Sequence, residues 1–199
     1  MEGELFSSFE EAWAAFLSRE EPLEDFVGSL PVEESFLSVW HAPPGEAAAA
    51  EAAVVQDGLS GLRRLRMTPR HWLHVSLAVG RVADPAVVRE RLLGFGSFEA
   101  EYGPATCFHD ALVLEVRSDR FAEVVRAVDP ERDLTFFLPH LSVAYVDGSP
   151  GPEPARERLL HLRDRPRVVD RVSEVHLCVV PIARDRILTP WRTVATVPL

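Results

Sequence analysis

Apolar segments with strand character alternate with helical segments along most of this chain. Residues 35–42 (SFLSVWHA) have strand character and stop at Pro43 and Pro44, whereas residues 45–55 (GEAAAAEAAVV) are rich in alanine, the strongest helix former. Further strands are expected at 71–79, 98–103, 111–116, 135–146, 172–180 and 187–197, and further helices at 84–95, 119–128 and 155–162. The pattern therefore predicts a mixed fold of strands and helices.

The first thirty residues are expected to form a helical extension that packs on the rest of the protein. Ser8 and Glu11 have the spacing of a capping box, in which each side chain accepts a hydrogen bond from the other residue's backbone N–H. The aromatic residues that follow recur at helical spacing: Phe9, Trp13 and Phe16. We therefore divide the chain into an extension over residues 1–30 and one main domain over residues 31–199.

Two passages of the main domain follow the same order of elements: strand, helix, strand, helix, strand. The first passage begins at residues 35–42 and the second at residues 111–116 (ALVLEV). The middle strand of the first contains HVSL, residues 74–77, and the middle strand of the second contains HLSV, residues 140–143. This agreement predicts an internal duplication of about 70 residues, with a histidine and a serine in the same place in each half.

Strand geometry places the polar residues of each tetrapeptide on one face. Residues two apart share a face, so His74 lies beside Ser76 and His140 lies beside Ser142, with apolar residues on the opposite face. Two histidines can divide the proton transfers at a phosphodiester, because one accepts a proton from the nucleophile and the other donates one to the leaving oxygen. Their ordinary pKa of about 6.5 suits both tasks. The serine hydroxyls can donate hydrogen bonds to non-bridging phosphoryl oxygens. A zinc site at the two histidines is not favoured, because the sequence has no third ligand at a usable spacing.

The two motifs, one in each half of a duplicated domain, resemble those of the 2H phosphoesterase superfamily. That superfamily includes the bacterial 2′-5′ RNA ligases and the small cyclic-nucleotide phosphodiesterases. The resemblance covers residues 35–199 and implies a bilobal α+β fold, in which two antiparallel sheets face a central cleft with helices outside. Carried over by position, His74 and His140 are the paired acid and base, and Ser76 and Ser142 bind the phosphate.

The same resemblance implies a hydrolase, a phosphodiesterase that opens 2′,3′-cyclic phosphates of RNA ends or nucleotides without a metal ion. Two alternatives stay open at this point. The protein could be a module that binds a nucleotide or an RNA end without turnover, or it could have 2′-5′ RNA ligase activity, which equilibrium disfavours in water. A purely structural protein would leave the paired motifs unexplained.

Residues near the first motif are weaker candidates for substrate binding. Trp72 shares a face with His74 if the strand is regular, so it could stack on a base, although a packing role is favoured. Arg70 stands in an arginine-rich segment (61–70) that either attracts phosphate or is a solvated loop. His71 falls on the opposite face from His74. The other histidines are expected to be structural, or to be surface residues with local hydrogen bonds: His41, His109, His161 and His176.

The composition excludes several classes of function. The 199 residues carry a net charge of −10, which argues against broad, non-specific binding to a nucleic-acid backbone. All 21 basic residues are arginine, which excludes P-loop ATPases, pyridoxal enzymes and ligases that use a lysyl adduct. Cys107 and Cys178 form neither a disulfide framework nor a metal-spaced pair.

The sequence also bears on location and partners. No apolar run reaches the length of a membrane span, and the acidic N-terminus lacks the layout of a signal peptide. We expect a cytoplasmic monomer that needs no cofactor, metal or membrane. The expected partner is an RNA end or a small cyclic nucleotide.

Overall fold

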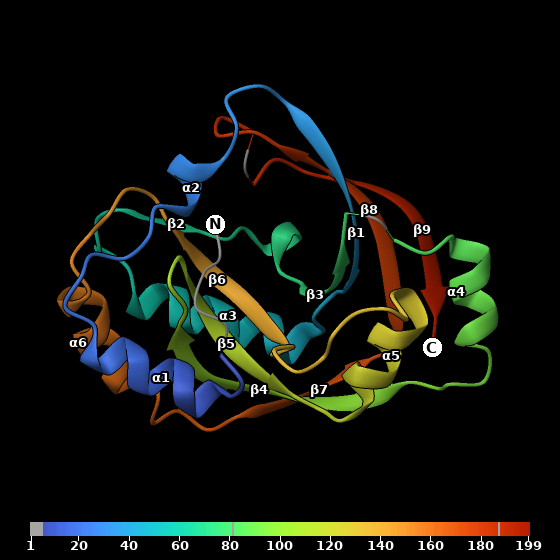
Figure 1. Cartoon of the computed structure of the whole chain (residues 1–199). Coiled ribbons are helices and arrows are strands. Elements are labelled where there is room, and N and C mark those ends of the chain that lie inside the picture. Colours follow the sequence, from blue (N-terminus) through green and yellow to red (C-terminus); the bar gives the residue numbers. More distant parts are fainter. Residues whose placement is uncertain (1–5, 81, 187) are drawn as a thin grey trace.

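A computed structural model describes residues 6–80, 82–186 and 188–199. Figure 1 shows a strongly curled sheet with helices packed around its outside. The strands in the described part of the chain are β1 (Ser35–Ala42), β2 (Leu65–Met67), β3 (Val75–Val79), β4 (Phe98–Cys107), β5 (Ala111–Arg117), β6 (His140–Val146), β7 (Val168–Val172), β8 (Glu174–Ile182) and β9 (Arg192–Pro198). The helices are α1 (Phe9–Ser18), α2 (Phe26–Ser29), α3 (Glu46–Gly58), the 3₁₀ turn η1 (Arg70–Trp72), α4 (Pro85–Arg91), α5 (Arg120–Val128) and α6 (Glu153–Leu162).

The sheet consists of two lobes that meet between β3 and β6. Its strand order is β7-β4-β5-β6-β3-β1-β8-β9, with β2 paired to β6, and every pairing is antiparallel. The junction is one paired position, Val75 opposite Leu141. The fold is therefore α+β and bilobal, as predicted, and the two expected sheets are continuous through this pair.

The strand order relates the two halves of the sequence to each other. The first half supplies β1, β3 and β4, and the second half supplies β5, β6 and β8. One lobe contains β3-β1-β8 and the other contains β6-β5-β4. Each lobe thus has the first two strands of one half and the last strand of the other. The two strands that carry the histidine motifs lie next to each other at the centre.

The N-terminal extension contacts both lobes. Ser8 Oγ accepts a hydrogen bond from the Glu11 N–H at 3.1 Å, but the Glu11 carboxylate accepts from Ser7 instead of Ser8, so half of the expected capping box forms. Helix α1 packs against β4. Farther along, Phe26 of α2 stacks on Tyr145 of β6 with ring centroids 4.4 Å apart, while Val27 is buried in a cluster with Trp72, Val39, Cys178 and Val180 of the other lobe.

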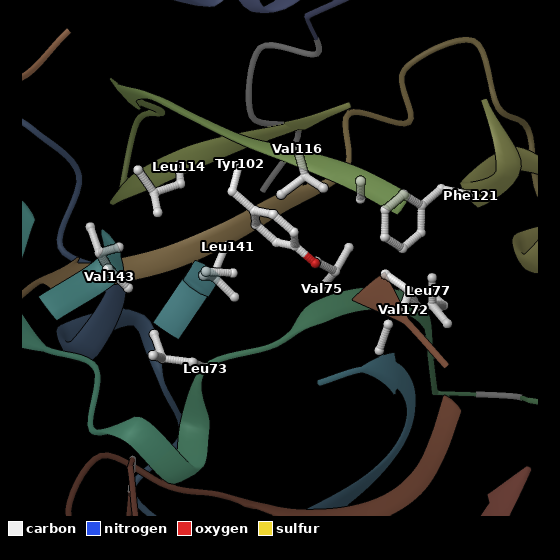
Figure 2. Packing of buried hydrophobic residues seen from close by; sticks show 14 of the residues in the cluster. Leu73, Val75, Leu77, Tyr102, Leu114, Val116, Phe121, Leu141, Val143 and Val172 are labelled. Carbon is white, nitrogen blue, oxygen red and sulfur yellow. The ribbon is translucent and has the colours of Figure 1, made fainter. Parts of the chain in front are cut away.

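Alternating residues of the central strands form the main core. In Figure 2, Val75 and Leu77 of β3 point toward the same interior as Leu141 and Val143 of β6. The Tyr102 side chain of β4 also lies there, and its hydroxyl has no hydrogen-bond partner among the described residues. Because Val75 and Leu141 point into this core, the residues on either side of them in sequence point to the opposite face of the sheet.

Several predicted boundaries were wrong. Residues 70–72 form η1 because Trp72 N–H bonds to the Pro69 carbonyl, so β3 begins only at Val75 and the argument from strand alternation does not apply to His71 or Trp72. Strand β6 begins at His140, after a turn that closes between Phe137 and Leu134. The hydrophobic pattern did not predict β2, β7 or α2, which are three to five residues long.

Candidate active site

The sheet register brings the two histidine motifs together. Val75 and Leu141 are opposite each other on antiparallel β3 and β6. One step along this register in either direction places Ser76 across from His140 and His74 across from Ser142. The four residues predicted from the sequence therefore meet where the lobes join, on the face turned away from the main core.

Both imidazoles are oriented in the same way by their own backbone. The Nδ1 atom of His74 lies 2.6 Å from the Trp72 carbonyl oxygen, and that of His140 lies 2.7 Å from the Leu138 carbonyl oxygen. A carbonyl oxygen can only accept a hydrogen bond, so Nδ1 carries the proton in each neutral ring. The Nε2 atom is left as the basic nitrogen that can exchange a proton with a ligand.

The two serines have different partners. The Ser76 hydroxyl lies 2.9 Å from His74 Nε2, so it donates to this nitrogen when the imidazole is neutral. Ser142 is 8% exposed and is hydrogen-bonded to the Tyr145 side chain. Burial raises the pKa of Tyr145, while this hydrogen bond opposes the increase. Ser76 is thus the more accessible of the two hydroxyls, and it lines a pocket together with His140.

Burial favours the neutral form of both histidines by lowering their pKa values. Desolvation lowers the pKa of His74 to about 4, against a smaller opposing effect of the hydrogen bond to Trp72 and with a further decrease from the charge of His140. Desolvation also lowers the pKa of His140, where the hydrogen bond to Leu138 opposes it and the charge of Arg132 adds to it. A bound phosphate anion would favour the protonated form of either ring.

A pocket of about 240 Å³ opens beside His140. Five of the residues that line it carry polar groups, and most of the others are aromatic. The polar residues are Ser76, His109, Asp110, Arg132 and His140, and the aromatic ones are Phe6, Phe108, Phe136 and Phe137. Phe108 also meets the His140 ring edge-on, with centroids 4.9 Å apart. An apolar pocket with a few convergent polar groups has the usual character of a small-molecule site.

Two residues next to His74 were missed by sequence reasoning. His41, which we expected to be a surface or locally bonded residue, is 4% exposed, and its ring centroid lies 5.4 Å from that of His74. Trp191 stacks on His41 at 4.9 Å and meets the His74 ring edge-on at 4.7 Å. The available signal was the alternation in β1, which places His41 on the face opposite Trp40.

Neither weaker candidate from the first motif reaches the pocket. Trp72 is 4% exposed, and its ring stacks on Trp191 and donates a hydrogen bond to the Thr189 carbonyl, so it is a packing residue with no face open to a base. Arg70 forms an ion pair with Glu46 at 2.8 Å, and both side chains are exposed. The arginine that lines the pocket is Arg132 instead, a residue that no motif in the sequence indicated.

Neither a metal site nor a membrane span is found in the described part of the chain. Within residues 6–80, 82–186 and 188–199, no three histidine, cysteine, aspartate or glutamate side chains are grouped so as to hold a metal ion. None of the helices in those ranges is long and apolar enough to cross a bilayer.

The burial of His41 predicts a pH-dependent stability. Desolvation lowers its pKa from 6.5 to about 2 in the folded protein, with smaller contributions from the charges of His74 and His176. The unfolded chain therefore binds a proton that the folded chain does not, so this contribution to stability is complete above pH 6.5 and is lost progressively as the pH falls toward 2. We expect His41→Gln to reduce the loss of unfolding free energy between pH 7 and pH 5 by about 2 kcal/mol.

Urea denaturation of wild type and variant at both pH values measures this difference. His161→Gln is the matched control, because His161 is exposed on α6 and its replacement should leave the pH dependence unchanged. Equal losses for the wild type and His41→Gln would contradict the burial of a neutral His41.

Comparisons with known proteins support the fold. No family model matches the sequence, and no curated protein matches it. The solved structures similar to the chain include TT0787 of Thermus thermophilus (15% identity, TM-score 0.52, covering 82% of this chain and 97% of that one). A conserved protein of unknown function from Agrobacterium tumefaciens, ATU0111, has 14% identity and a TM-score of 0.55, with 92% and 97% covered. Escherichia coli LigT complexed with 3′-AMP has 13% identity and a TM-score of 0.52, with 91% and 99% covered. The chain thus shares the fold of TT0787, ATU0111 and LigT, which confirms the predicted α+β fold.

Proposed function

We propose that the protein is a phosphodiesterase that hydrolyses 2′,3′-cyclic phosphates of RNA ends or nucleotides. The observation that carries the proposal is the matched anchoring of His74, which immediately precedes β3, and His140, which begins the adjacent strand β6. Each ring donates from Nδ1 to a carbonyl two residues earlier, which leaves each Nε2 for proton transfer at the junction of the lobes. Acid–base catalysis requires two such nitrogens, one neutral and one protonated.

The reaction follows from this arrangement. One histidine, neutral, accepts a proton from the attacking water, and the other, protonated, donates one to the ribose oxygen that leaves phosphorus. One P–O bond forms and one breaks, so the product is a phosphomonoester with a free ribose hydroxyl. The Ser76 hydroxyl can turn from His74 toward a non-bridging oxygen, where negative charge increases in the transition state.

Burial lowers the pKa of both histidines, so the negative charge of the substrate is expected to favour the protonated form of one of them. A phosphodiester is an anion at neutral pH, and its approach raises the pKa of the imidazole nearest to it. The substrate class is supported by LigT, a protein of the same fold that is seen complexed with 3′-AMP, a ribonucleotide with a phosphate on the ribose 3′ oxygen. The pocket beside His140 is small enough to favour one nucleotide over a long duplex.

Incubation of the purified protein with 2′,3′-cyclic nucleotides and with RNA that ends in a 2′,3′-cyclic phosphate tests this proposal. We expect a phosphomonoester product, formed equally well with and without EDTA. Thermal stabilisation by the same compounds without any product would instead favour a binding module. Joining of a cyclic-phosphate end to a 5′-hydroxyl end, without hydrolysis, would favour ligation.

A further inference from the structure

Arg132 lies in the wall of the pocket beside the two motifs. It belongs to the segment between α5 and β6, and it lines the pocket together with Ser76 and His140. Neither the spacing of the motifs nor the arginine-rich segment before the first motif pointed to this position. Arg132 thus lies beside Ser76, which is predicted to bind phosphate, and His140, which is predicted to transfer a proton.

The guanidinium of Arg132 is held in position without being neutralised. Its Nη1 donates a hydrogen bond to the Leu77 carbonyl of β3 at 3.0 Å, and its carbon lies 5.1 Å from the centre of the Phe137 ring. No carboxylate of the described residues forms an ion pair with it. By contrast, Arg66 pairs with Asp147 and Arg165 with Glu51.

This arrangement leaves a positive charge in the wall of the pocket that Ser76 and His140 also line, and the same wall contains the Asp110 carboxylate, which forms no ion pair with Arg132 in the described part of the chain. The charge of Arg132 adds to burial in lowering the pKa of His140, so the two groups interact across the pocket. An anion between them would be attracted to the guanidinium and would also favour protonation of the histidine. An arginine fork is well suited to this task, since it presents several N–H donors to phosphate oxygens in a fixed plane.

We propose that Arg132 is a phosphate-binding residue of this site, which donates from the guanidinium nitrogens not bonded to Leu77 to a non-bridging oxygen of the substrate phosphate. The identity of the substrate as a cyclic phosphodiester rests on the proposed function, whereas the binding of a phosphate group does not. A purely structural role, in which Arg132 only ties its loop to β3, makes a different prediction. In that case a neutral side chain that keeps the hydrogen bond to Leu77 would leave phosphate binding intact.

Four variants of the full chain separate these roles. Arg132→Gln keeps an amide donor for the Leu77 carbonyl and removes the charge, and Arg132→Met keeps the apolar stem against Phe137. Arg132→Lys keeps the charge without the fork. Arg126→Met is the matched control, because Arg126 is exposed on α5 and its replacement changes the net charge by the same amount.

The measurements are the dissociation constant for inorganic phosphate and for 3′-AMP, and the kcat and KM for a 2′,3′-cyclic nucleotide. We expect Arg132→Gln and Arg132→Met to weaken binding of both probes by about 10- to 100-fold, the effect of a lost charge-assisted hydrogen bond. Arg132→Lys should recover part of this affinity, and Arg126→Met should match the wild type. Unfolding midpoints establish that each variant is folded, and if one neutral variant is not, the other gives the answer.

The outcomes distinguish this inference from the proposed function. Wild-type affinity for phosphate in Arg132→Gln or Arg132→Met would overturn the assignment of Arg132, whether or not the protein hydrolyses cyclic nucleotides. If these variants lose affinity for phosphate, Arg132 is supported as a phosphate ligand. If the wild-type protein at the same time shows no turnover of cyclic nucleotides, the proposed hydrolysis is overturned.

Discussion

Replacement of His74 or His140 by asparagine is expected to lower kcat/KM for a 2′,3′-cyclic nucleotide by about 10²- to 10⁴-fold, the usual contribution of a general acid or base. Asparagine is the sharper choice than alanine because its amide occupies the place of Nδ1. It can still donate to the Trp72 or the Leu138 carbonyl, while the proton-transferring Nε2 is gone. Steady-state kinetics with the purified variants measures the loss, and alanine at each position should abolish turnover in the same way.

The controls for this prediction separate catalysis from folding. His161→Asn alters an exposed histidine of α6 and should retain wild-type kinetics. The double variant of His74 and His140 should lose little more activity than either single variant, because an acid and a base that act on the same transition state are not additive. A kcat/KM within tenfold of wild type in both single variants would exclude these residues as the acid–base pair.

Much of the fold was accessible from the sequence because its elements have local signals. The helices over α3, α4, α5 and α6 were predicted from composition and periodicity, and the strand over residues 35–42 matches β1 in both bounds. The errors occurred where a local signal was ambiguous. The residues before His74 are apolar or aromatic enough for a strand, but Pro69 begins a 3₁₀ turn there. Strands β2 and β7 are too short to show a period.

The candidate site was accessible only in part, for a related reason. The two tetrapeptides carry a repeated local pattern, so the sequence predicted that His74, Ser76, His140 and Ser142 act together, and β3 and β6 do lie side by side. His41 carries no such repeat, and its contact with His74 depends on the pairing of β1 with β3, which periodicity does not specify. Arg132 lies in a turn whose composition predicts only a solvated loop.

The second large effect is expected at Glu115, a carboxylate on β5 that is completely buried. Its Oε1 accepts from Arg163 at 2.9 Å and its Oε2 accepts from Arg117 at 3.0 Å. Arg163 also contacts the N-terminal extension, since its guanidinium carbon lies 4.3 Å from the centre of a ring of Trp13. Arg117 does the same through an ion pair with Glu10 at 2.8 Å. Glu115 is therefore the acceptor that joins α1 and the end of α6 to the sheet.

Glu115→Gln preserves the shape of the side chain, replaces one accepting oxygen by a donor and leaves both guanidinium groups without their shared counter-charge. Removal of one member of a fully buried ion pair costs about 3–5 kcal/mol, but Arg117 and Arg163 retain 39% and 20% of their side-chain exposure, so water compensates for part of the loss. We expect the unfolding free energy to fall by about 2–3 kcal/mol in urea denaturation at pH 7. Glu99→Gln, on the exposed face of neighbouring β4, should change it by less than about 0.5 kcal/mol. If the two variants were equally stable, the polar link between the extension and the sheet would contribute nothing to the fold, and the contact of α1 with β4 would depend on its buried apolar residues Phe9, Ala12 and Phe16 alone.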